Sequence, residues 1–442
     1  MLFCVYAYDL RRHVSLYKFS YWGFFVVLVV LAGLRYRIGT DSIVYENFYD
    51  RVPMLWELPS FKFDSTRFEP GFMIFQSIAR TFSPDFIWLQ FLESIVVNLV
   101  IFWFILRNTR HRFLCLTFYY VVLYLNLNTQ VLREALAVSL FLLAWPALRD
   151  GKWWLYYILA GLASFMHTSA LFTLLIPIFC LPGIRELFVL GKRTIFILIF
   201  ILAVGIFIER RFSDVFSLIA VTQRVIDRVN TYSKSAFSSG HLNIFGFIST
   251  LVQYCLYPLL ALYFANQELK FKQKFKPSIS SNTVNLTPKN LVGSKGRKSR
   301  ENEMLADVKL NLKEKEDERK KAKREFDRWQ MMVLLGVYFM VLSLTMFIFG
   351  RYYNYFGMFC FAVIADWAFS KMVVKGKEIR LKNSLWVIIL LPWFFYNLYA
   401  YAAPVNKSGT LKTYQIYYPY YSRLNPQVDS KREDIYRYLD AR

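Results

Sequence analysis

The sequence lacks the residue patterns of a disulfide framework, a zinc site and a nucleotide-binding loop. Its five cysteines all lie in apolar stretches, and no two have the spacing of metal ligands, so we expect neither structural disulfides nor bound zinc. Neither GxxxxGK(S/T) nor a Rossmann fingerprint occurs, so we expect no nucleotide site. Residues 1–13 have no basic segment ahead of their apolar part and make a poor signal peptide. We interpret them as a short interfacial segment or as the remnant of a span that begins upstream.

Acidic residues are also scarce. The 31 Asp and Glu residues stand against 54 Lys and Arg, which gives a formal net charge of +23. A basic chain can indicate a nucleic-acid partner. Here, however, most lysines lie in a few short loops and one long linker, where the cytoplasmic segments of membrane proteins concentrate positive charge. We therefore expect membrane lipids, and not nucleic acid, to face these charges.

Apolar residues are abundant. The chain is 56% hydrophobic and 19% aromatic, whereas a soluble domain is usually less than half apolar. Repeated apolar stretches between charged loops predict an all-α, polytopic membrane helix bundle. Several stretches are short for a hydrocarbon core of about 30 Å, so we expect short or broken helices, particularly at the outer face. The eleven predicted spans are 20–34, 84–106, 113–126, 129–147, 153–166, 168–182, 194–208, 244–264, 329–349, 353–370 and 384–402.

Basic loops predict the orientation of the chain. Every second loop is basic, which by the positive-inside rule places the N-terminus in the cytoplasm and the C-terminus outside. The predicted parts are an N-terminal membrane bundle at 1–264 with outer loops 35–83 and 209–243, a cytoplasmic charged linker at 265–328, C-terminal membrane helices at 329–403 and an extracytoplasmic tail at 404–442.

The linker combines two kinds of sequence. Residues 277–298 are polar and rich in Ser, Asn and Lys, which predicts disorder. Residues 301–328 have the pattern of a charged helix that runs into the next span. The linker is either a solvated connector near anionic lipid or a regulatory or partner-binding segment.

Arginine is frequent at the predicted outer face, where a positive-inside protein should carry little of it. At least ten arginines fall there. A guanidinium group binds phosphate oxygens bidentately and keeps its charge when partly desolvated. Arg133 and Arg351 each begin a predicted span at its outer end, where the helix dipole also favours an anion. We infer a phosphate site, although Arg351 could instead belong to an interfacial aromatic belt and Arg228 could be solvated in its loop.

Gln130, Arg133 and Glu134 occupy positions i, i+3 and i+4 and therefore share one helix face. Small residues on the same helix favour close packing, so this face should point into the bundle. Two structural alternatives remain open for the charged members. Arg133 could snorkel to the outer headgroups, and Glu134 could be its local partner or a solvated residue of the first turn.

His167 interrupts the apolar stretch 153–181 at its outer turning point. Histidine is expensive in lipid and titrates near neutral pH, which favours a general base, although it could also be a hydrogen-bonded helix terminus. Asp41 is a second candidate base, or a turn residue after a glycine. Glu69 is another, or a cap of the helix that begins with Pro70.

Six short motifs carry a resemblance to a known family. In order along the chain they are RYRIGTD (35–41), FEPGF (68–72), LREALA (132–137), FMHTSAL (165–171), GRYYNYF (350–356) and YYPYYS (417–422). Together they resemble the EpsG family of bacterial exopolysaccharide proteins, which are distant relatives of the Wzy-type O-antigen and capsule polymerases. The resemblance covers almost the whole chain. The sequence departs from the family in a shortened first span and in a longer linker.

The resemblance implies a metal-independent glycosyltransferase of the lipid-donor, GT-C-like kind with no cofactor. Such an enzyme transfers a growing glycan from an undecaprenyl-pyrophosphate donor to a lipid-linked repeat unit at the outer face of the bacterial inner membrane. The product would be O-antigen, capsule or exopolysaccharide. The expected partners are undecaprenyl-pyrophosphate-linked oligosaccharides, membrane lipids and other polysaccharide-assembly proteins.

Residue chemistry and the resemblance together suggest individual roles. His167 is the first choice for the base, with Glu69 and Asp41 second. Arg133 and Arg351 would stabilise the departing diphosphate, with Arg35, Arg37 and Arg228 as further candidates. The predicted substrate-binding residues are Arg35, Arg37, Asp41, Tyr45, Gln130, Glu134, Arg228 and Tyr232.

Two other functions stay open. A flippase or transporter would also need outer arginines, but it should show internal repeats and charged sites at the membrane midplane, and we find no clear repeat. An O-antigen ligase-like transferase, which passes the glycan to a different acceptor, is the nearer alternative. An acyltransferase with His167 as its base would not need so many arginines.

Overall fold

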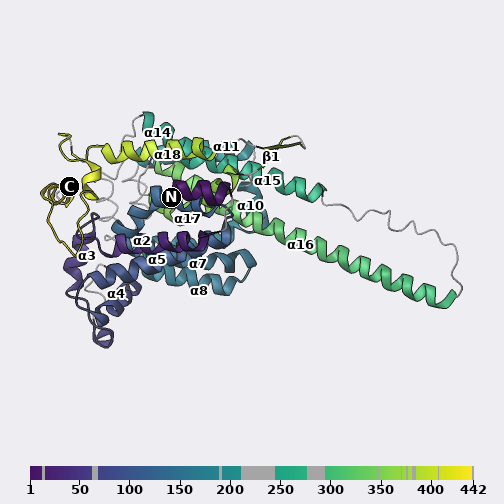
Figure 1. Cartoon of the computed structure of the whole chain (residues 1–442), viewed down its shortest axis with the longest axis horizontal. Helices are drawn as coiled ribbons and strands as arrows, with labels where there is room; N and C mark the ends of the chain where they lie inside the picture. The colour runs from purple at the N-terminus through teal and green to yellow at the C-terminus, as the bar shows by residue number, and fades with distance from the viewer. Residues whose placement is uncertain are drawn as a thin grey trace.

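A computed structural model describes residues 1–11, 15–61, 68–188, 192–210, 244–275, 294–345, 349–369, 371–374, 377–380, 385–406 and 408–440. Most helices lie side by side along the long axis of the molecule, and one helix projects far beyond the bundle (Figure 1). The predicted helical architecture is confirmed. The described residues add one short antiparallel hairpin, β1 (Lys371–Val374) and β2 (Lys377–Arg380), inside a segment predicted as a basic loop.

The helices follow the apolar stretches of the sequence, and the described residues of each of the eleven predicted ranges are largely helical. In chain order the helices are α1 (Leu2–Cys4), α2 (Tyr17–Gly33), α3 (Ser42–Tyr49), α4 (Pro70–Phe82), α5 (Ile87–Asn108), α6 (Arg112–Phe118), α7 (Leu132–Asp150), α8 (Trp153–Met166), α9 (Ile176–Phe179), α10 (Pro182–Phe188), α11 (Lys192–Arg210), α14 (Ile244–Thr250), α15 (Tyr257–Phe275), α16 (Ser294–Ser343), α17 (Gly350–Ala368), α18 (Leu385–Ala402) and α19 (Ser430–Asp440).

The lengths of these helices bear on the number of spans. In the part of the chain that the structure describes, two helices are long and apolar enough to cross a membrane, Ile87–Asn108 and Phe247–Lys270. Six further apolar helices are shorter, including Trp153–Met166 and Thr168–Phe179. The expectation of short or broken helices is therefore confirmed, while the total of eleven spans stays a prediction.

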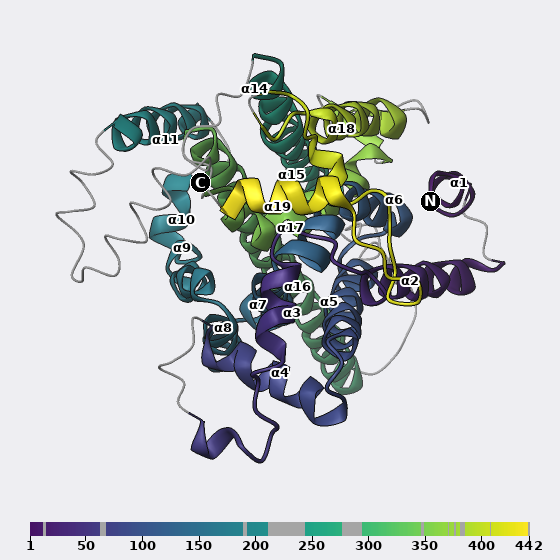
Figure 2. The same cartoon turned by 90° about the vertical axis from the view of Figure 1, so that its left-hand side faces the viewer.

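The two ends of the bundle carry different parts of the chain. Helices α3, α4 and α19 lie at one end, whereas β1, α10 and the projecting part of α16 lie at the other (Figure 1). This arrangement separates the first predicted outer loop from the predicted linker, as the alternation of charge requires. Which end faces the cytoplasm remains a prediction. Seen end-on, α19 crosses the end that carries α3 and α4 (Figure 2).

The charged helix predicted at 301–328 is confirmed, because α16 runs without a break from Ser294 to Ser343. Most of the segment predicted as disordered lies outside the described residues. At the bundle, Nη1 of Arg328 donates to the carbonyls of Leu148 (2.8 Å) and Arg149 (2.6 Å) in the last turn of α7. A cation is favourable there, because the final carbonyls of a helix lack intrahelical partners and carry partial negative charge.

Helices α7 and α17 form the centre of the bundle. Almost every side chain of α17 from Tyr353 to Ala368 is buried, as expected for a helix that is apolar on all sides. Trp145 of α7 packs edge-to-face against Phe359 of α17, with ring centroids 5.0 Å apart. Because large aromatic pairs contribute strongly to packing, the two helices are held in a fixed relation. Their N-termini, which carry Arg133 and Arg351, therefore lie at one end of the same core.

The N-terminal residues pack on the bundle. Tyr8 stacks on Phe113 with ring centroids 5.0 Å apart. The buried carboxylate of Asp9 accepts a hydrogen bond from the Leu114 amide at 2.8 Å, near the start of α6, where the first amides of a helix lack intrahelical partners. All five cysteines are free thiols in the structure.

Candidate active site

The motif FEPGF places Glu69 at the centre of a polar cluster. Pro70 is the first residue of α4, and Glu69 precedes it in an extended conformation, with φ −67° and ψ 147°. Gly71 allows α4 to approach α8 closely, since a Cβ atom there would lie 2.7 Å from the Phe165 carbonyl oxygen. Proline at the first helical position and the close contact at glycine thus direct the Glu69 carboxylate toward the end of α8.

Both oxygens of the Glu69 carboxylate are used. Oε2 accepts a hydrogen bond from Nη1 of Arg133 at 2.6 Å. Oε1 lies 2.9 Å from Nδ1 of His167 and also accepts from the amide and hydroxyl groups of Thr168, each at 3.3 Å. No side-chain bond from Glu69 caps α4. Glu69 thus occupies the N-cap position of α4 without capping it through its side chain. The carboxylate instead links the start of α7 to the break between α8 and the segment that follows it.

His167 occupies a break between two helical segments. Helix α8 ends at Met166, His167 is extended with φ −155° and ψ 131°, and a 3₁₀ segment runs from Thr168 to Leu175. An ionised carboxylate can only accept hydrogen bonds, so Nδ1 must carry the hydrogen shared with Glu69. The proton-accepting position is then Nε2, which has no hydrogen-bond partner among the described residues.

The charge state of Glu69 supports this assignment. Burial raises the pKa of its carboxyl group, but the hydrogen bond from His167 and the charge of Arg133 outweigh burial and lower that pKa well below its ordinary value. Glu69 is therefore ionised at neutral pH. An ionised partner on Nδ1 fixes the tautomer and stabilises the imidazolium that forms when Nε2 takes up a proton.

Arg133 is the second residue of α7 and is held on three sides. Besides its bond to Glu69, its Nε donates to the Tyr45 hydroxyl at 3.4 Å, and its guanidinium lies 5.0 Å from the centroid of the Phe68 ring. The side chain is 23% exposed. These contacts keep the guanidinium at the end of the bundle, beside His167, and do not fit an arginine that only reaches toward lipid headgroups.

Glu134 lies beside this cluster and faces the core. It is 1% exposed, so the interpretation as a solvated first-turn residue is wrong. Its Oε1 accepts from Nδ2 of Asn354 in α17 at 2.7 Å. Arg351, His167 and Arg133 all lie within electrostatic range of its carboxylate. The carboxylate of Glu134 thus interacts electrostatically with basic residues from three segments of the chain.

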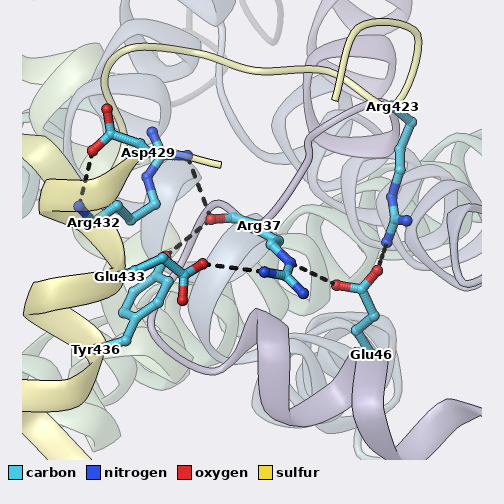
Figure 3. A network of polar contacts seen from close by, with 7 residues as sticks. All are labelled: Arg37, Glu46, Arg423, Asp429, Arg432, Glu433 and Tyr436. Carbon is cyan, nitrogen blue, oxygen red and sulfur yellow. Dashed lines mark hydrogen bonds and ion pairs between the residues drawn. The ribbon is translucent and has the colours of Figure 1, made fainter. Parts of the chain in front are cut away.

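The arginines of the first outer loop lie apart from this cluster, and Arg37 takes part in a different network (Figure 3). Arg37 has a left-handed backbone, φ 50°, and its guanidinium pairs with Glu46 (3.6 Å) and with Glu433 of α19 (3.3 Å). Arg35 is buried, and its guanidinium donates to the Ala32 carbonyl. The structure therefore places both arginines against the C-terminal tail and the chain itself rather than beside His167.

The remaining predicted residues lie around these two groups. Gly39, with φ 102°, lies directly against the Thr129 carbonyl, and Asp41 follows it as the residue before α3. Gln130 donates from Nε2 to the Tyr417 hydroxyl of the tail. Tyr45 reaches Arg133 from α3, as described above. Arg228 and Tyr232 lie outside the described residues.

Some residues of the site were not identified from the sequence. Thr168 directly follows His167, and this position next to a candidate base is the one sequence feature that could have identified Thr168 as part of the site. Asn354 lies inside the GRYYNYF motif, but a single asparagine in a tyrosine-rich helix gives no sign of a carboxylate partner. The tail residues that bind Arg37 also give no sign of this contact in the sequence, because most of the chain separates them from it.

Comparison with known proteins gives one match. The family model described as the EpsG family matches residues 18–287. Glu69, Arg133 and His167 lie inside the matched range, and Arg351 lies beyond it. No curated protein matches the chain, and no solved structure does.

Proposed function

The chain belongs to the EpsG family of exopolysaccharide-related membrane proteins, and we propose that it is a polysaccharide polymerase. It would transfer a glycan from an undecaprenyl-pyrophosphate donor to a lipid-linked repeat-unit acceptor at the outer face of the bacterial inner membrane. The observation that carries the proposal is the Glu69 carboxylate, which joins His167 to Arg133 at the end of the bundle.

His167 supplies the base in this scheme. Nδ1 donates to Glu69, so the lone pair of Nε2 takes the proton from the acceptor hydroxyl. The oxygen forms a bond with the anomeric carbon of the donor, while the bond from that carbon to the diphosphate oxygen breaks. Undecaprenyl pyrophosphate leaves with the electron pair. A positioned base of this kind typically contributes a factor of about 10² to 10⁴ in rate.

Arg351 and the remaining N–H groups of Arg133 would stabilise the departing diphosphate. Both arginines are second residues of their helices, α17 and α7, where the helix dipole adds to their charge. Negative charge on the diphosphate grows as the glycosidic bond breaks. Contacts that strengthen during this step lower the barrier rather than only tightening binding.

Glu69 has a further effect on Arg133. By accepting from Nη1, it fixes the orientation of the guanidinium and neutralises part of its charge before substrate arrives. A diphosphate would then meet a pre-oriented donor, which reduces the loss of side-chain entropy on binding. Loss of Glu69 would therefore affect both the base and the anion contact.

The test is a polymerisation assay with purified protein in detergent. The protein is mixed with an undecaprenyl-pyrophosphate-linked repeat unit, and the products are separated by size. We expect a ladder of chain lengths from the wild-type protein and at least a 100-fold lower rate from Arg133→Ala. Arg110→Ala, a substitution at the opposite end of the bundle, is the matched control. Long chains from Arg133→Ala would remove Arg133 from catalysis.

The same lipid-linked glycans separate the other functions in cells. A polymerase variant without activity accumulates single repeat units on the outer face of the membrane. A flippase variant leaves them on the inner face, and a ligase variant accumulates finished chains on the lipid. Accumulation of single units inside would overturn the proposal.

A further inference from the structure

One oxygen of the Glu134 carboxylate has a partner and the other has none. Oε1 accepts the hydrogen bond from Asn354 at 2.7 Å. Oε2 is buried and has no hydrogen-bond partner among the described residues. A buried carboxylate oxygen without a donor is destabilising, because the oxygen loses its bonds to water and gains nothing in return. Such an oxygen beside a candidate base suggests a ligand contact.

The surroundings limit what this ligand group can be. An ionised carboxylate oxygen only accepts, so the group that binds the ionised form of Glu134 must be a hydrogen-bond donor. Arg351, His167 and Arg133 lie within electrostatic range of Glu134 and disfavour a cationic ligand. A diphosphate cannot bind Oε2 directly, because two anions would oppose each other. The remaining group in the proposed reaction is a neutral hydroxyl of a sugar.

Asn354 has a defined orientation against Glu134. Its Oδ1 accepts from Nδ2 of Asn126 at 3.4 Å, and its Nδ2 faces the carboxylate. The carboxylate requires a donor, so the opposite placement of the amide atoms is excluded. Asn354 therefore holds Oε1 in place and, through it, sets the direction of Oε2.

We propose that Oε2 of Glu134 accepts a hydrogen bond from a hydroxyl of the acceptor sugar, and that Asn354 is the positioning residue for this contact. The inference rests on the proposed function and deepens it, because it assigns the recognition of the acceptor to the α7–α17 pair. His167 and the arginines act on the proton and the leaving group, while Glu134 orients the attacking sugar.

The experiment measures acceptor KM and kcat separately. The acceptor probe is a repeat unit on a short alkyl chain without a diphosphate, which can accept but cannot donate, and the lipid-linked donor is kept saturating. Glu134→Gln keeps the bond from Asn354 to the side-chain oxygen but replaces Oε2 by an NH₂ group. We expect its acceptor KM to rise about 10- to 100-fold, the range for losing a hydrogen bond to a charged group, with a smaller change in kcat.

A double substitution tests Asn354. In Glu134→Gln with Asn354→Asp, the new carboxylate accepts from the glutamine NH₂ group, so the glutamine oxygen takes the place of Oε2. We expect this protein to recover most of the acceptor KM lost in Glu134→Gln. Asn354→Asp alone places a second carboxylate against that of Glu134, so its acceptor KM should stay above the wild-type value. Asn397→Asp, which alters an asparagine in α18 that bonds to the Trp393 carbonyl at 2.7 Å, is the matched control.

Acceptor analogues that each lack one hydroxyl give a test that does not depend on the double substitution at Glu134 and Asn354 adopting the intended geometry. One analogue should raise KM with the wild-type protein and cause no further rise with Glu134→Gln. Two results would overturn this inference while leaving the polymerase intact. One is that every analogue raises the acceptor KM of Glu134→Gln by the same factor as that of wild type. The other is an unchanged acceptor KM in Glu134→Gln. Failure of the wild-type protein to elongate any acceptor would instead overturn the proposed function.

Discussion

Oε1 of Glu69 lies 2.9 Å from Nδ1 of His167, although 97 residues separate the two positions in the chain. The same carboxylate binds Arg133 through its other oxygen. One anionic side chain therefore sets the tautomer of the candidate base and the direction of a candidate phosphate ligand. Substitutions near this group should affect chemistry more than folding, and each can be compared with a matched residue elsewhere in the chain.

The first prediction concerns His167. His167→Ala should lower the polymerisation rate by about 10² to 10⁴, because the acceptor hydroxyl loses its base. Affinity for the lipid-linked donor should change little. The chain offers a matched control in His111, which follows the C-terminal end of α5 and whose Nδ1 lies 3.0 Å from Oδ1 of Asp366 in α17. His111→Ala should retain the wild-type rate, and a wild-type rate from His167→Ala would contradict the role of base.

The second prediction concerns pH and Glu69. Because the folded-state pKa of Glu69 is lowered, its carboxylate stabilises the protein above the ordinary pKa of about 4.3. Below that pH the carboxyl group is protonated in the unfolded chain but stays ionised in the folded protein. The contribution of Glu69 to the free energy of unfolding therefore falls as the pH is lowered. We expect Glu69→Gln to unfold at a lower temperature than wild type at pH 7, with a smaller difference near pH 3. Thermal unfolding in detergent over this range measures it.

The sign of this effect is specific. A difference between Glu69→Gln and wild type that grew on acidification would mean that the carboxyl group is protonated in the folded protein. Glu57→Gln, which alters an exposed carboxylate that accepts from the Met54 amide at 2.7 Å, provides the control.

The third prediction uses a glycine to move the carboxylate. Gly71→Ala places a methyl group 2.7 Å from the Phe165 carbonyl oxygen, so α4 must shift away from α8 and carry Glu69 away from His167. A displacement of about 1 Å in a catalytic group can reduce the rate about 100-fold, and we expect a loss of that order in the polymerisation assay. Gly161→Ala on α8, where nothing lies within 4 Å of the added Cβ, should leave the rate unchanged. Equal rates for the two variants would show that the α4–α8 contact does not position the site.

Much of the fold and part of the site follow from local sequence. Apolar stretches predict helices because a helix satisfies its backbone hydrogen bonds within one segment, and the described residues of each predicted span are largely helical. The convergence of Arg133, His167 and Glu134 could be predicted because charge alternation assigns loops to one end of a bundle. The assignment of loops to one end of the bundle requires no knowledge of distances between side chains.

Pairings across the chain could not be predicted in this way. The rarity of arginine in outer loops predicts that Arg37 binds substrate, but its guanidinium pairs with Glu46 and Glu433. Glu433 lies 396 residues further along the chain, and nothing in either local sequence indicates the other. The ion pair between Arg37 and the C-terminal tail depends on tertiary packing, which cannot be predicted from the hydropathy pattern.

The last prediction concerns this tail. Arg432 is 1% exposed, and its guanidinium donates to the backbone carbonyls of Gln415 (3.2 Å), Pro419 and Arg37 (3.5 Å). Arg432→Ala would leave three carbonyls without this donor, and hydrogen bonds to a charged group are typically worth about 1.5 to 3 kcal/mol. We expect a lower unfolding temperature and faster proteolysis within 404–440, because the tail loses its attachment to the first outer loop. Arg437→Ala alters the same helix at a side chain that is 80% exposed and should change neither quantity. Equal proteolysis of the two variants would show that Arg432 does not hold the tail in place.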